Sequence, residues 1–171
     1  MFLRNFLAAL VGCALFAAPV AAIAADRGPS TPEERKQALS FIQDFESNPL
    51  GPNAIQEREW VLQWIIGIPD VHVSMCMVLD KLPKGDKKDG GTIFAAELFS
   101  QTAFLLQNPD KQDDLLAQYQ AGVEGALRVY EVLLKANPKD RQPYLDELIE
   151  RRDAGTLVDF VKARGSTNCR K

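Results

Sequence analysis

The segment from His72 to Met77 holds the side chains best suited to binding a soft metal ion. It contains the only histidine of the chain, followed by Met75, Cys76 and Met77. Imidazole, thioether and thiolate groups are ligands for Cu(I). On a helix, His72, Met75 and Cys76 would share one face, whereas on a strand the methionines would point away. Methionine and cysteine are also ordinary core residues, so copper binding is kept as an alternative function and no metal ligand is assigned.

No other pattern predicts a particular catalytic chemistry. A single histidine limits any serine or cysteine hydrolase, and the chain has no Gly-x-Ser-x-Gly motif. Gly90-Gly91 lacks the lysine and the spacing of a phosphate-binding loop. Acidic pairs such as Glu33-Glu34 lie in the first turn of predicted helices, where the helix dipole favours them. We therefore assign no catalytic residue and no cofactor, and keep an enzyme using carboxylate chemistry as a second alternative.

Residues 1–25 have the pattern of a secretory signal peptide. Arg4 precedes an apolar run from Phe6 to Ala18, and small residues lead up to Ala25. Leu10-Val11-Gly12-Cys13 resembles a lipobox, and an uncleaved membrane anchor is the other alternative. We expect cleavage near Ala25 and export to a bacterial periplasm or the extracellular space.

Two cysteines, Cys76 and Cys169, remain after such cleavage. An oxidising compartment favours their pairing. A bridge across a loop of roughly 100 residues is expected to stabilise the fold by about 4–5 kcal/mol. Two free thiols are the alternative, because geometry decides whether a bridge can form.

The remaining chain, residues 26–171, is expected to form one domain. The whole chain has 20 basic and 23 acidic residues and therefore a net charge of −3, which argues against nucleic acid as a partner. No second apolar run approaches spanning length, so no membrane association is expected after cleavage.

Apolar residues recur at intervals of three and four, which predicts an all-α bundle of six or seven helices. Thr31-Pro32 starts the first helix, and Asn-Pro pairs at 48, 108 and 137 end three of them. A flexible loop is expected at 83–91. The segment 71–82 also alternates as a strand would, but a lone strand would lack a partner, so we expect a helix that Asp70 caps. The expected helices cover 32–47, 53–68, 71–82, 92–107, 113–136, 143–154 and 156–164.

The longest expected helix, 113–136, carries an apolar seam for a neighbouring helix. Val123 and Ala126 lie in this seam. Gly122 and Gly125 should weaken a helix by about 1 kcal/mol each relative to alanine. We therefore expect another backbone to pack closely against them.

Three aromatic residues are candidates for a partner-binding surface. Trp60 and Trp64 lie one turn apart in a stretch that is apolar almost throughout, which predicts a helix buried nearly all round. Phe104 falls on the same side as Glu97 and Gln101, a side expected to face solvent. Aromatic residues on a surface mark binding sites. The sequence therefore favours an exported, non-enzymatic protein that binds an unspecified protein or small molecule.

Overall fold

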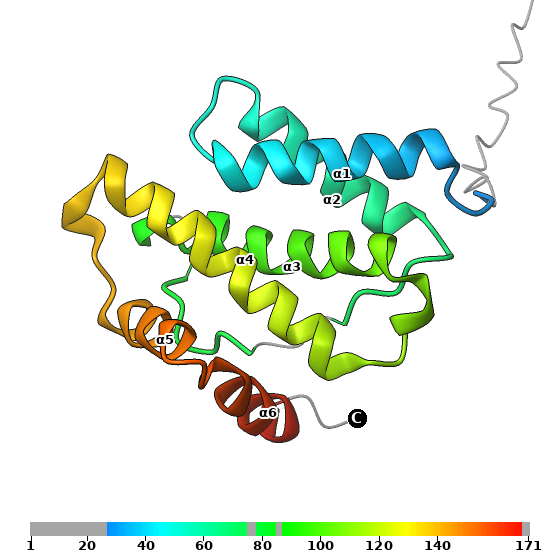
Figure 1. The fold of residues 1–171 in the computed structure, drawn as a ribbon. Coiled ribbons are helices and arrows are strands. Elements are labelled where there is room, and N and C mark those ends of the chain that lie inside the picture. The colour runs from blue at the N-terminus through cyan, green and yellow to red at the C-terminus, as the bar shows by residue number, and fades with distance from the viewer. Residues whose placement is uncertain (1–26, 75–77, 85–86, 169–171) are drawn as a thin grey trace, which may run out of the picture.

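Six α-helices are present in the computed structural model, which describes residues 27–74, 78–84 and 87–168. No β-strand occurs in these ranges. The expectation of an all-α bundle is therefore confirmed (Figure 1). The signal segment 1–25, Cys76 and Cys169 lie outside the described residues. The helices are α1 (Pro32–Ser47), α2 (Ala54–Gly67), α3 (Gly90–Gln107), α4 (Leu115–Ala136), α5 (Pro143–Asp153) and α6 (Leu157–Asn168).

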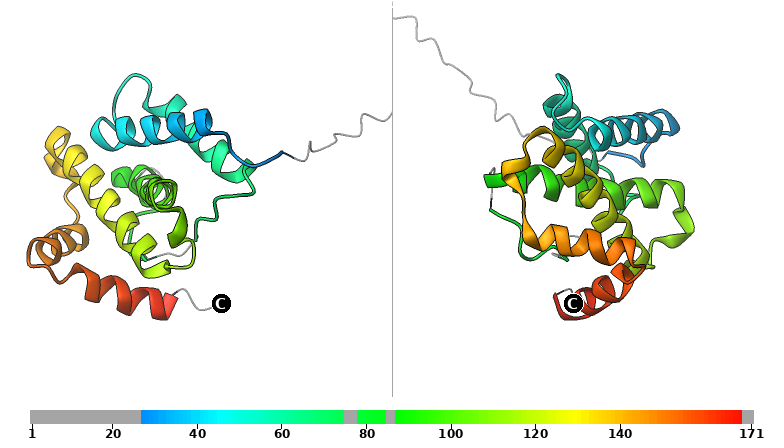
Figure 2. Two further views of the ribbon diagram at one scale, coloured as in Figure 1. Left: turned by 45° about the vertical axis from the view of Figure 1, so that its right-hand side comes forward. Right: turned by 60° about the vertical axis from the view of Figure 1, so that its left-hand side comes forward.

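Helix α3 lies at the centre of the molecule. The antiparallel pair α1 and α2 covers one side of it, and α4 crosses it on another (Figures 1 and 2). Helices α5 and α6 pack beyond α4. Eleven residues of α3 are buried, among them Ile93 and Phe99. A helix buried on most of its circumference must contact several neighbours, so α3 organises the core.

The helix ends follow the expected capping residues. The Thr31 side chain accepts from the Glu34 backbone, and the Glu34 side chain accepts from the Thr31 backbone, which completes a capping box. Asn48, Asn108 and Asn137 each end a helix and donate their backbone N–H to the carbonyl four residues earlier. The predicted start of α1 and the three Asn-Pro stops are thus confirmed.

Helices α3 and α4 pack with their backbones close together at two glycines. A Cβ on Gly122 would lie 2.8 Å from the backbone oxygen of Glu97, and one on Gly125 would lie 1.6 Å from Ser100 Oγ. Val123 and Ala126, on the same seam, are fully buried. The expected close packing of this helix is confirmed.

The expected helix at 71–82 is wrong for the part that the structure describes. Residues 71–74 and 78–82 have neither helical nor strand structure. Asp70, expected to cap that helix, instead accepts hydrogen bonds from Ser30 and Arg35. Burial opposes its ionisation, but these bonds hold the pKa of Asp70 below its ordinary value. The segment's apolar residues Val78 and Leu79 are buried by tertiary packing.

Two further expectations need correction. The loop 83–91 is shorter than predicted, because Lys87–Asp89 form a 3-10 turn and α3 begins at Gly90, which is buried. Helix α2 is not buried all round, since Ile66 is 77% exposed. Amphipathic packing of α2 against one side of the molecule leaves its other face in solvent. No described helix has the length and apolar character needed to cross a membrane.

Candidate functional site

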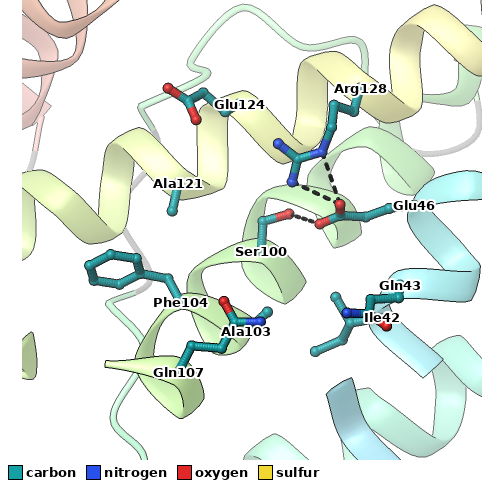
Figure 3. A pocket seen from close by; sticks show the side chains of 10 residues that line it. All are labelled: Ile42, Gln43, Glu46, Ser100, Ala103, Phe104, Gln107, Ala121, Glu124 and Arg128. Carbon is teal, nitrogen blue, oxygen red and sulfur yellow. Dashed lines mark hydrogen bonds and ion pairs between the residues drawn. The ribbon is translucent and has the colours of Figure 1, made fainter. Parts of the chain in front are cut away.

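A cavity of about 240 Å³ opens between α1, α3 and α4 (Figure 3). Its polar groups come from all three helices, and its apolar wall comes mainly from α3 and α4. Its lining includes Glu46 from α1, Ser100, Ala103, Phe104 and Gln107 from α3, and Ala121, Glu124 and Arg128 from α4.

One side of the cavity is fixed by a Ser100–Glu46–Arg128 cluster. The Ser100 hydroxyl donates to Glu46 Oε1 at 2.5 Å, and Arg128 Nη2 donates to Glu46 Oε2 at 2.7 Å. The Arg128 Nε donates to the same oxygen at 3.0 Å. The Arg128 side chain is 49% exposed, so the ion pair itself is worth only about 0.2–1 kcal/mol. The cluster matters mainly because it holds side chains of three helices in fixed positions.

Gly125 allows this cluster to form. Any side chain at this position would overlap Ser100 and would approach Glu46 Oε1 to 3.1 Å. The glycine expected from the sequence to face a neighbouring helix therefore also shapes the candidate site.

Phe104 forms the aromatic wall of the cavity. Its half-buried ring stands opposite Ala121, and Ala103 lies beside it (Figure 3). The short alanine side chains leave the space that a larger residue would fill. Phe104 was predicted to mark a partner site, and the structure places it in the wall of this cavity.

The cavity has an excess of negative charge. Glu46 is balanced by Arg128. Glu124 accepts a hydrogen bond from the neutral Gln120 side chain at 3.0 Å and has no salt bridge within the described part of the chain. A cationic or hydrogen-bond-donating group next to an apolar stem would complement this lining.

The two tryptophans lie elsewhere, between α1 and α2. Trp64 was a candidate for an exposed partner surface, but its side chain is buried. It packs with Ala38 and Leu105. Trp60 is half-buried and stacks on Trp64, with ring centroids 5.9 Å apart. The structure does not bring either tryptophan to the cavity that holds Phe104.

The segment considered for copper binding, His72 to Met77, lies only partly within the described residues. His72 is exposed, and no helix is present at 71–74 to align it with Met75 and Cys76, which lie outside the described residues. Within the described ranges, no three His, Cys, Asp or Glu residues are grouped so that they could hold a metal ion.

Sequence reasoning missed a buried carboxyl group at Glu97. The side chains of Glu97 and Gln101, expected in solvent, are each only 2% exposed. No described residue makes a hydrogen bond of good geometry to either carboxylate oxygen of Glu97. Burial raises the pKa of Glu97 to about 8, and the Leu79 backbone offsets this only in part. The sequence held one signal of this burial: the other faces of the helix that carries Glu97 and Gln101 are apolar, as expected for a helix surrounded by other elements.

Comparison of the chain with protein-family models, with curated protein sequences and with solved structures found no match.

Proposed function

We propose that this is an exported binding protein that captures a protein partner by one anchor side chain inserted between α1, α3 and α4. The observation that carries the proposal is the cavity itself, which combines the Phe104 ring with a fixed Glu46–Arg128 pair and an uncompensated Glu124. Export follows from the predicted signal segment 1–25.

The size of the cavity supports an anchor side chain over a larger ligand. Sites for drug-sized molecules and cofactors typically have about 300–1,000 Å³, whereas this cavity has about 240 Å³. Partner recognition commonly depends on a few side chains that fill such pockets. A lysine or arginine of the partner fits best, because its stem would contact Phe104 while its charge would approach Glu124.

An enzyme using carboxylate chemistry is the second candidate, and Glu97 is the observation that favours it. Its pKa of about 8 is typical of a group that can act as an acid or base near neutral pH. Glu97 is buried and does not line the cavity of Phe104, so the two candidates predict different essential residues.

Substituting Phe104 should weaken partner capture while leaving the fold intact. The wild type, Phe104→Ala and the control Lys139→Ala would be used as bait in extracts of the native exported fraction. We expect a partner retained by the wild type and by Lys139→Ala to be reduced at least tenfold with Phe104→Ala, because the aromatic wall is lost. Glu124→Gln should have a smaller effect of the same sign.

Equal capture by Phe104→Ala, with circular dichroism showing a folded protein, would contradict this role. Turnover of a substrate that is abolished by Glu97→Gln without loss of stability would favour the enzyme instead.

A further inference from the structure

A second cavity, of about 350 Å³, lies between α1 and α2. Phe41 and Trp60 form its aromatic part, Glu57 contributes a carboxylate, and Gln37 lies on its edge. It shares no lining residue with the cavity of Phe104. Its chemistry is therefore independent of the partner site proposed above.

The two aromatic rings meet at a right angle. Phe41 and Trp60 have centroids 5.2 Å apart and an interplanar angle of 90°. Trp60 is held in place by its stack on the buried Trp64 ring. Both rings line the cavity, and their perpendicular contact gives it an aromatic corner, a surface suited to an alkylated ammonium group.

The carboxylate of Glu57 has no counter-ion in the described part of the chain. Its Oε2 atom is buried without a hydrogen-bond partner among those residues, and neither Glu57 nor the neighbouring Asp44 takes part in a salt bridge there. Burial, then the charge of Asp44 and a hydrogen-bonding contact with the Asp44 carboxyl, raise the pKa of Glu57. A bound cation would offset the repulsion between these two carboxyl groups and favour the ionised form of Glu57.

We propose that the α1–α2 cavity binds a small organic ammonium ion, with Phe41 and Trp60 contacting its alkyl groups and Glu57 balancing its charge. Cation–π contact with tryptophan and a carboxylate beside it are the two elements that such recognition needs. An inorganic cation would use the carboxylate alone and would gain little from the aromatic corner.

Titration with choline, followed by tryptophan fluorescence, tests the proposal. Trp60 and Trp64 are the only tryptophans of the chain, so the emission reports on this cluster alone. We expect a saturable change with choline. With 3,3-dimethylbutan-1-ol, which has nearly the same shape but no charge, binding should be at least tenfold weaker. Sodium chloride at matched ionic strength should give no saturable change.

Two variants of the cavity and one control complete the test. Glu57→Gln removes the charge, and Gln37→Lys places a permanent cation on the edge; each should weaken choline binding at least tenfold. Glu124→Gln, in the other cavity, should bind choline as the wild type does. Equal binding of choline and the neutral alcohol, no saturable change with choline, or undiminished binding by a folded Gln37→Lys protein would overturn the proposal. A failure of the Phe104 experiment would leave it unaffected.

Discussion

Raising the pH from 5 to 8 should destabilise the wild-type protein far more than a Glu97→Gln variant. The folded-state pKa of Glu97 is about 8, against 4.5 ordinarily. Between these values the folded protein keeps a proton that the unfolded chain releases, so each pH unit favours unfolding by about 1.4 kcal/mol. The stability due to this proton is fully present below pH 4.5 and is lost as the pH rises through 8. The expected difference between the two proteins is roughly 3 kcal/mol across this range.

Urea unfolding at a series of pH values, followed by circular dichroism, measures this difference directly. Glutamine has nearly the same shape as glutamic acid and cannot ionise, so the variant should show the shallower dependence. Parallel pH profiles for the two proteins would show that Glu97 ionises in the folded state as it does in the unfolded chain.

Gly125→Ala should destabilise the fold by about 2 kcal/mol or more, even though alanine is the better helix former. The added Cβ would lie 1.6 Å from Ser100 Oγ and 2.4 Å from Ser100 Cβ, so rotation of the hydroxyl alone cannot relieve the overlap. Overpacking of a tight helix contact costs typically about 1–3 kcal/mol, and more where a backbone must move. The alanine gains about 1 kcal/mol of helix propensity in return.

A double-mutant cycle separates this overlap from other effects. Ser100→Gly removes both overlapping atoms, so the Gly125→Ala/Ser100→Gly protein should be more stable than additivity predicts. Gly122→Ala is the matched control, because its overlap is with Gln101 and the Glu97 backbone and should not respond to Ser100→Gly. Strict additivity of Gly125→Ala and Ser100→Gly would contradict the close approach of α3 and α4.

Features that depend on neighbouring residues in the sequence were predictable. The Thr31 capping box and the Asn48-Pro49 stop act within one helical turn, and both are confirmed. Gly122 and Gly125 were also informative, because glycine in the middle of a helix weakens it unless a neighbour needs the space. In these cases local preference and tertiary packing agree.

Features that depend on distant residues were not predictable. Asp70 has the pattern of a helix cap, but Ser30 and Arg35, at least 35 positions away, take its hydrogen bonds. Glu97 and Gln101 indicated a solvent face, yet α3 is surrounded by other elements. The polarity of a residue is a poor guide to its exposure when the helix that carries it is buried on most of its sides.

Of the groups that form the candidate site, the sequence indicated Phe104 but not the Glu46–Arg128 pair. Phe104 was singled out because the side of α3 that carries Glu97 and Gln101 was expected in solvent, and that premise was wrong, although Phe104 does line a cavity. The pairing of Glu46 with Arg128 spans 82 positions and has no local signature. Only the packing of α1, α3 and α4 brings these groups together.

Site-specific photo-crosslinking from the edge of the Phe104 cavity tests the central claim most directly. Gln107 is exposed and lines the cavity, so a benzophenone side chain at this position would face a bound partner. In native cells we expect one dominant crosslinked protein from position 107, lost when Phe104 is also changed to alanine and absent from position 139. Crosslinks of the same pattern from both positions, or a pattern unchanged by Phe104→Ala, would contradict recognition through this cavity.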